Sequence, residues 1–129
     1  MDFGFSSARR LKKGWQFDLV FRTGRRETGG LVRLLFITKM EGPPLVGVTV
    51  GRKIAHAVRR VRGRRVMREA FRRLLPWIKE GTWIIASLRE KALEAGADEV
   101  YADMAASLKR RGLLRADWPG ADWKVDAKG

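Results

Sequence analysis

Residues 51–75 have the sequence GRKIAHAVRRVRGRRVMREAFRRLL, in which the apolar positions repeat with the period of an α-helix. This repeat predicts a helix over 57–75, ended by Pro76 and Gly81. One side of the helix carries an unbroken apolar stripe: Gly63, Val66, Met67, Ala70, Phe71 and Leu74. Arg60 lies at the edge of the opposite side. That side carries six arginines: Arg62, Arg64, Arg65, Arg68, Arg72 and Arg73. The helix is therefore expected to pack through one side and to present guanidinium groups on the other.

The segments before this helix predict another helix and two strands. The first helix is expected to begin at Ser6 or Ser7 and to run to about Thr23, because Gly24 is a typical C-terminal signal. Residues 25–30 are predicted to form a turn-rich link. Strands are expected over 31–38 and 45–51, and the Glu-Gly-Pro-Pro run between them predicts a hairpin with a long loop.

The segments after the arginine-rich helix predict a buried strand over 82–88 and a last helix. This helix is expected to be capped by Asp98, to run to about Arg111 and to end at Gly112. The order of elements indicates an α+β fold, a small mixed sheet packed with helices. We expect one domain over 1–112 and a flexible C-terminal extension over 113–129, in which Ala-Asp-Trp occurs twice.

The charge of the chain is strongly positive and unevenly distributed. Its 28 Lys and Arg residues exceed its 14 Asp and Glu residues, which gives a net charge of +14 and an isoelectric point near 11.3. Residues 52–73 contain ten basic side chains and a single acid, Glu69. An ordinary solvated face would mix both signs. The excess therefore predicts a polyanion partner, with nucleic acid favoured over an anionic membrane surface.

The composition leaves few ways to build an active site within the chain. It has no cysteine and one histidine, His56, which excludes a thiolate metal site, a Cys–His pair and a multi-histidine site. We therefore assign no catalytic residue and no metal ligand to the chain. No apolar run approaches the roughly 20 residues of a membrane span, and no secretory signal is recognisable. A cytoplasmic protein is expected.

Two features outside the arginine-rich helix indicate a binding surface. Phe17 and Phe21 are spaced i, i+4 and lie on one face of the first helix, either in the core or as a platform for unpaired bases. In the strand over 31–38, the alternation places Arg33 and Leu35 on the face opposite Leu34. An arginine on that face fits the lining of a cleft better than a sealed core.

The arginine-rich stretch resembles the signature of the bacterial ribonuclease P protein family. Residues 51–72 follow its pattern of a basic pair, Ile, two residues, Ala-Val, one residue, Arg-Asn-Arg, one residue, Lys-Arg, two residues, Arg-Glu, one residue and Phe-Arg. Upstream, residues 17–24 (FDLVFRTG) are similar to the family's Phe-x-x-Val-Phe-x-x-Gly segment. The resemblance covers about residues 8–111. Val61 stands where the family has asparagine, and Arg64 where it has lysine.

This resemblance implies a fold, a partner and a division of labour. The implied fold is like domain 2 of ribosomal protein S5, with a left-handed β-α-β crossover through the basic helix. A large RNA, the ribonuclease P RNA, would hydrolyse the phosphodiester with magnesium ions that it mainly holds itself. The protein would be a monomer in a 1:1 complex with this RNA. It would also hold the 5′ leader of precursor tRNA during removal of the leader.

Carried over position by position, the resemblance also implies two sets of site residues. The set expected to contact the catalytic RNA is Arg52, Lys53, Arg60, Arg62, Arg64, Arg65, Arg68 and Arg72. The set expected to line the leader cleft is Phe17, Phe21, Arg33, Leu35 and Val61.

Two other functions remain open from the residues alone. A ribosomal protein or RNA chaperone would explain the charge equally well and the paired phenylalanines less well. A DNA-binding helix is disfavoured, because the basic face lacks the Asn or Gln side chains that read bases in a major groove.

Overall fold

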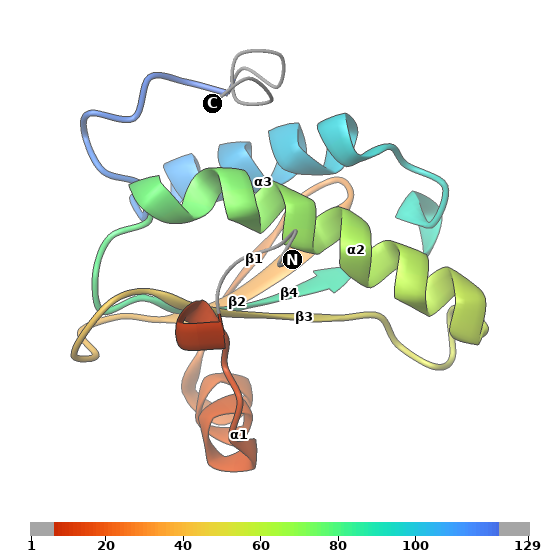
Figure 1. Cartoon of the computed structure of the whole chain (residues 1–129), viewed down its shortest axis with the longest axis horizontal. Helices are drawn as coiled ribbons and strands as arrows, with labels where there is room; N and C mark the ends of the chain where they lie inside the picture. The colour runs from red at the N-terminus through yellow and green to blue at the C-terminus, as the bar shows by residue number, and fades with distance from the viewer. Residues whose placement is uncertain (1–6, 122–129) are drawn as a thin grey trace.

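The computed structural model, which describes residues 7–121, contains one four-stranded sheet with helices on both faces (Figure 1). The strand order is β1-β2-β4-β3. The strands are β1 (Arg25–Thr28), β2 (Val32–Ile37), β3 (Leu45–Thr49) and β4 (Trp83–Leu88). The helices are α1 (Gly14–Thr23), α2 (Ala57–Leu74) and α3 (Ala97–Arg110). Short 3-10 turns are η1 (Ser7–Arg9), η2 (Leu75–Trp77) and η3 (Glu90–Ala92).

The pairing of the strands differs from the predicted hairpin. β2 pairs antiparallel with β1 and with β4, whereas β3 pairs parallel with β4. The prediction of a β2–β3 hairpin is therefore wrong, and the segment 25–30 contains a strand where only turns were expected. Parallel neighbours need a crossover connection, which α2 supplies between β3 and β4. The predicted α+β fold with a mixed sheet is confirmed.

The first helix is shorter than predicted. It begins at Gly14, and not at Ser6 or Ser7, while Ser7–Arg9 forms a 3-10 turn. The side chain of Gln16 fixes this start, because its Oε1 accepts hydrogen bonds from the backbone N–H groups of Lys12 (2.8 Å) and Lys13 (3.0 Å). The predicted end at Thr23, followed by Gly24, is confirmed.

The sheet separates two apolar clusters. The larger one lies between the sheet and the pair α2 and α3, where Leu34, Ile84, Met67, Phe71 and Met104 are fully buried. The smaller one lies under α1 on the other face and is built around Leu11, Val20, Trp83 and Ile85. Both faces of β4 are covered over residues 83–86, which explains why these four residues are all apolar.

The end of the chain is packed beyond the predicted boundary. α3 has Gly96 and not Asp98 as its N-cap, because Glu99 accepts a hydrogen bond from the Gly96 N–H (3.1 Å). Leu113 and Leu114 are buried, and Leu114 forms a β-bridge with Ile78. Two residues that follow Gly112 therefore pack on the rest of the structure. Residues 122–129 of the predicted extension lie outside the described residues.

Candidate nucleic-acid interface

The outward side of α2 is set by the burial of its other side. Gly63, Met67, Ala70, Phe71 and Leu74 are buried and Val66 is half-buried, which confirms the predicted apolar stripe. The close packing at Gly63 leaves no room for a side chain, because a Cβ there would lie 2.9 Å from Val50 Cγ2 and 3.0 Å from Leu88 Cδ2. α2 therefore lies against the sheet at this point, and its arginines project from the remaining surface.

Four of these arginines are held by the protein itself. Arg60 donates to the Ala55 carbonyl (2.9 Å), and Arg62 donates to the carbonyls of Leu93 (2.8 Å) and Ala95 (3.1 Å). Two more arginines near the end of α2 bind Glu69. They are Arg72, through two hydrogen bonds of 2.7 and 3.0 Å, and Arg73, through one of 3.0 Å.

The position of Arg73 corrects the prediction that it lies on the outward face. Its side chain is only 7% exposed, because it turns back along the helix toward Glu69. The bond to Arg72 lowers the pKa of Glu69; burial opposes this, and the bond to Arg73 lowers the pKa further. Glu69 in turn raises the pKa of Arg72.

Three arginines of α2 have side chains that make no ion pair and no hydrogen bond within the described residues: Arg64, Arg65 and Arg68. Arg65 is exposed, and the other two are half-buried. Burial lowers the pKa of Arg68, and the neighbouring charges of Arg10 and Arg64 lower it further. Cations that repel one another without a nearby acid form a site for an anion. Arg52 and Lys53 lie exposed in the turn before α2 and extend the positive surface.

The two phenylalanines of α1 have different surroundings. Phe17 is half-buried and packs against the smaller cluster, where a Cβ on Gly47 would lie only 2.9 Å from its ring. Phe21 is 52% exposed. Phe17 is thus partly a core residue, whereas the ring of Phe21 is available for stacking.

The part of the sheet beyond α1 carries a row of polar side chains. Thr28 of β1 is paired in register with Arg33 of β2, Arg33 with Ser87 of β4, and Ser87 with Thr49 of β3. Residues paired in register share one face of a sheet. This face also carries Leu35 and Ile85, which contact the smaller cluster under α1. We call this set (Thr28, Arg33, Thr49, Ser87) the polar row.

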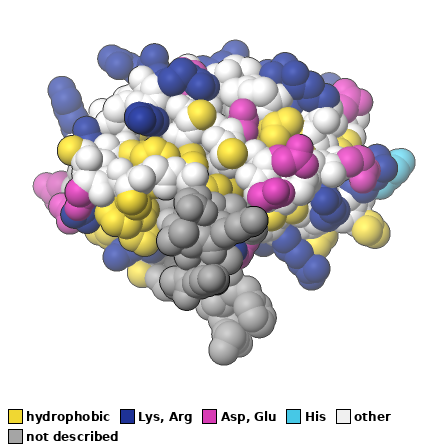
Figure 2. Space-filling view, turned by 90° about the horizontal axis from the view of Figure 1, so that it is seen from above, with side chains coloured by type: hydrophobic (Ala, Val, Ile, Leu, Met, Phe, Trp, Pro, Cys, Tyr) yellow, Lys and Arg dark blue, Asp and Glu magenta, His cyan; other side chains and the backbone are white. Residues whose placement is uncertain are grey.

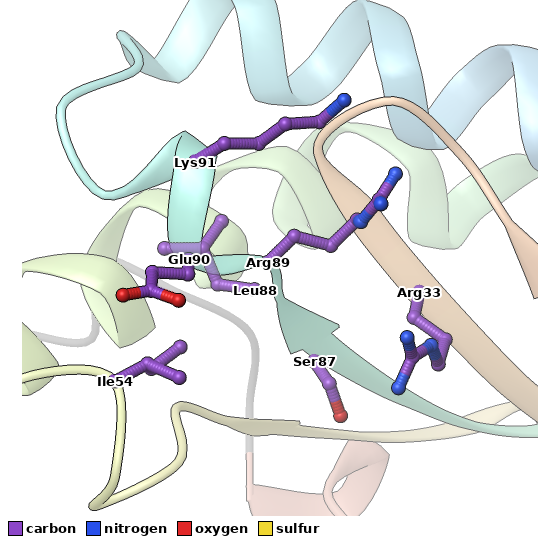
Figure 3. Close-up of a pocket in the computed structure, with 7 residues that line it drawn as sticks. All are labelled: Arg33, Ile54, Ser87, Leu88, Arg89, Glu90 and Lys91. Carbon is purple, nitrogen blue, oxygen red and sulfur yellow. The ribbon is translucent and has the colours of Figure 1, made fainter.

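A pocket of about 510 Å³ lies at the end of the polar row (Figure 3). Arg33 and Ser87 project to the same side of the sheet, and Ile54 lies opposite them in the turn before α2. Arg89 and Lys91 add two further positive charges, and Glu90 one negative charge. Arg89 also donates to the carbonyl of Gly29 (2.9 Å), which holds the β1–β2 turn beside the pocket.

Five residues of the polar row and of this pocket were not predicted from the sequence: Thr28, Thr49, Ser87, Arg89 and Lys91. Their contribution depends on strand order and register, which the sequence pattern did not reveal. Val61, assigned to the leader cleft, does not line this pocket. It is 41% exposed on α2, which packs on the other face of the sheet from α1.

The charge distribution is that of a polyanion-binding protein. Figure 2 shows Lys and Arg side chains gathered along the margins of the helix-covered face, with fewer Asp and Glu side chains between them.

Within residues 7–121, no group of three His, Cys, Asp or Glu side chains is placed to hold a metal ion. No helix in that range has the length and hydropathy of a membrane span.

Comparisons with known proteins point to a single family. The family model "Ribonuclease P" matches residues 5–112. The ribonuclease P protein component of Symbiobacterium thermophilum is 32% identical over 111 residues, which are 85% of this chain and 96% of the relative. That of Xanthomonas euvesicatoria is 34% identical over 111 residues, 85% of this chain and 75% of the relative.

Solved structures show the same fold. The RNase P protein of Thermotoga maritima superposes with a TM-score of 0.70 at 28% identity, covering 78% of this chain and 96% of that one. The RNase P protein of Staphylococcus aureus gives a TM-score of 0.72 at 21% identity, covering 84% of this chain and 100% of that one, and this likeness concerns the fold alone. With the family model, the relatives and the arginine-rich helix in agreement, this chain belongs to the bacterial ribonuclease P protein family, the protein component of the endoribonuclease that removes the 5′ leader of precursor tRNA.

Proposed function

We propose that the protein binds ribonuclease P RNA through α2 and holds the 5′ leader of precursor tRNA on the open half of the sheet face that α1 partly covers. The observation that carries the first part is the set of α2 arginines whose side chains make no ion pair and no hydrogen bond within the described residues, Arg64, Arg65 and Arg68. Guanidinium groups bind phosphate with two parallel hydrogen bonds, so this set suits an RNA backbone. Arg52 and Lys53 extend the same contact.

The four arginines bonded within the protein have a different role in this proposal. Arg62 uses both terminal nitrogens on the loop before α3, and Arg72 uses its guanidinium on Glu69. Each retains its charge near the RNA and also holds protein structure. Arg60 is similar, with one bond to the turn before α2.

The leader site is supported by the combination of Phe21 with the polar row. An exposed ring offers a stacking surface for an unpaired base, and such stacking tolerates any base. Arg33, with the hydroxyls of Thr28, Thr49 and Ser87, offers donors to the phosphates of the same strand. Leu35 and Phe17 form the apolar wall between the row and α1.

The chemistry itself is assigned to the RNA. We propose that magnesium ions bound mainly by the RNA drive the hydrolysis, while the protein neutralises phosphates and positions the leader. We further propose that the protein is a monomer that forms a 1:1 complex with this RNA in the cytoplasm.

The test is stimulation of leader removal by a bacterial ribonuclease P RNA at low magnesium concentration. The protein is expected to stimulate cleavage, whereas a ribosomal protein or general RNA chaperone would not.

Changing Arg64, Arg65 and Arg68 together to glutamine should weaken RNA binding and flatten its salt dependence, by about 0.7–0.9 in log–log slope for each phosphate that is no longer neutralised. The control changes three exposed cations elsewhere, Arg22, Lys109 and Arg115, to glutamine. Equal effects of the two triple variants would contradict the assignment to α2.

A further inference from the structure

A second pocket, of about 610 Å³, lies at the other end of the molecule from the first turns of α2. It is lined by residues from β1, β2 and the loop after β2, from the link between η2 and β4, and from the end of α3. One carboxylate, that of Glu80, is part of the lining. Five cations line the same pocket: Arg25, Lys39, Lys79, Arg110 and Arg111.

Two of these cations have an ordinary structural explanation. Arg110 and Arg111 form ion pairs with Glu27 at 3.0 and 3.7 Å, and Arg111 lies over the ring of Phe36 at 5.2 Å. Arg110 also lies in the last turn of α3 and Arg111 is its C-cap, where positive charge complements the helix dipole. They shape the pocket but do not by themselves indicate a ligand.

The other three cations have no such explanation. Arg25, Lys39 and Lys79 are exposed, and none has an ion-pair partner in the described part of the chain. They come from three separate segments, β1, the loop after β2 and the link before β4. Three converging charges without an acid of their own repel one another, and an anion in the pocket removes this repulsion.

The backbone at Lys39 strengthens the argument. Its φ of +66° lies in the left-handed region, which side chains with a Cβ avoid and glycine adopts freely. The fold imposes this turn, because Met40 N–H donates to the Gly81 carbonyl (3.0 Å) and a Cβ on Gly81 would lie 2.5 Å from Met40 O. A lysine at a position that suits glycine points to a use for its charge.

We propose that this pocket binds phosphodiester groups of a second segment of the partner RNA, one that the α2 arginines do not reach. The inference rests on the proposed RNA-binding function. α2 has 18 residues and is about 27 Å long, and its first turns lie at the opposite end of the molecule from the pocket. Arg52 and Lys53, in the turn before α2, are therefore too far from the pocket to contact the same phosphates. The hydroxyls of Thr38 and Thr82 in the lining are suitable donors to phosphate oxygens.

The first test compares two double variants that remove the same charge. Arg25→Gln/Lys79→Gln should make the log–log salt dependence of ribonuclease P RNA binding less steep by about 1.4–1.8, because two phosphates are no longer neutralised. The control, Arg22→Gln/Lys109→Gln, should leave the slope near that of the wild type. Equal slopes for the two variants would overturn the inference. Failure of the wild-type protein to bind the RNA would instead overturn the proposed function.

Hydroxyl-radical footprinting of the same complexes locates the second segment. The pocket variant should lose protection over an RNA stretch that stays protected with the Arg64/Arg65/Arg68 glutamine variant. If both variants lose protection over the same nucleotides, or if the pocket variant loses none, binding of a second RNA segment in this pocket is contradicted.

The second test separates charge from backbone strain at Lys39. Lys39→Gly relieves the left-handed conformation, and Lys39→Asn tolerates it, so neither should lower the melting temperature. Both remove the charge, so both should weaken RNA binding and reduce its salt slope by about 0.7–0.9. Unchanged RNA binding with a raised melting temperature would show that Lys39 is only a strained turn residue.

Discussion

Arg62 and Arg65 lie three positions apart on the same helix and belong to the same family motif, yet their environments differ. Arg62 donates hydrogen bonds to two carbonyls of the loop before α3, whereas the side chain of Arg65 makes no hydrogen bond and no ion pair within the described residues. The helical period places both on the polar side of α2, but only the tertiary structure brings residues 93–95 to Arg62. Weaker RNA binding after an Arg62 substitution therefore needs a stability measurement before it is assigned to the RNA interface.

The exposed ring of Phe21 leads to the first prediction. Phe21→Ala should weaken binding of leader-bearing precursor tRNA by about 1–3 kcal/mol and leave mature tRNA binding unchanged, because one base stack is removed. The melting temperature should change little, since the ring is half exposed. Trp15→Ala is the control: Trp15 is 57% exposed on the same helix but lies against Trp83, at a centroid distance of 5.8 Å. A large loss of stability without a leader effect would place Phe21 in the core.

The second prediction concerns Val61, where the family has asparagine. Val61 is 41% exposed on α2, one turn before Arg64 and Arg65, and offers only apolar contact there. Val61→Asn adds a side chain that can make one hydrogen bond to RNA, worth about 0.5–1.5 kcal/mol, so it should tighten binding of ribonuclease P RNA by about two- to tenfold without changing the melting temperature. Val58→Asn, at a position 83% exposed one turn earlier, is the control. Equal RNA affinities of all three proteins would make position 61 irrelevant to the RNA contact.

At the scale of elements, the last turns of α2 contain a carboxylate that responds to pH. Hydrogen bonds from Arg72 and Arg73 hold the pKa of Glu69 below its ordinary value of 4.5. The Glu69 carboxylate is therefore protonated at a lower pH in the folded protein than in the unfolded chain. The stabilisation is complete above pH 4.5 and is lost as the pH falls through the folded pKa.

The third prediction follows from this sign. Glu69→Gln should lower stability by about 1 kcal/mol near pH 6, after allowance for the partial exposure of the pair. The difference from the wild type should shrink as the pH is lowered to about 3. Thermal melts of both proteins across this range measure it. A difference that is constant with pH would mean that the charge of Glu69 does not contribute to stability.

Elements also differ in how well the sequence predicted them. α2 and β4 were predicted nearly to the residue, because an apolar stripe and an apolar run are local patterns. β1 was missed because its sequence, Arg-Arg-Glu-Thr, has no apolar alternation; it lies at the edge of the sheet and is largely exposed. The β2–β3 hairpin was wrongly predicted because neighbours in sequence were assumed to pair, whereas β4 inserts between them.

At the scale of the whole molecule, some binding surfaces could be predicted from local sequence patterns and others could not. The arginines of α2 and the phenylalanines of α1 follow from local periodicity and from the family motif. The polar row and both pockets combine residues from three or more segments, so they depend on strand order and register. Long-range contacts of this kind carry no signal in a single sequence.

Asp103 connects α3 to the turn between β1 and β2 through hydrogen bonds to three backbone N–H groups. Its carboxylate accepts hydrogen bonds from the N–H groups of Gly30 (2.9 Å), Leu31 (3.0 Å) and Val32 (2.9 Å), more than 70 residues earlier in the chain. The β1–β2 turn packs so closely on it that a Cβ on Gly29 would lie 2.5 Å from Asp103 Oδ2. One carboxylate thus joins the last helix to the first hairpin, beside the pocket that contains Arg33 and Arg89.

The fourth prediction is that Asp103→Asn destabilises the whole fold. Hydrogen bonds to a charged acceptor are worth about 1.5–3 kcal/mol, and an amide can keep only some of them, because its NH₂ group would face backbone donors. At about 4 °C per kcal/mol, the melting temperature should fall by about 6–12 °C. Asp98→Asn makes the same chemical change at an exposed site on α3 and should cost only about 0.3–1 kcal/mol, through the helix dipole. Since the β1–β2 turn also borders the proposed leader site, Asp103→Asn should weaken leader binding below its melting temperature as well. Equal melting temperatures for the two variants would show that the turn holds its place without Asp103.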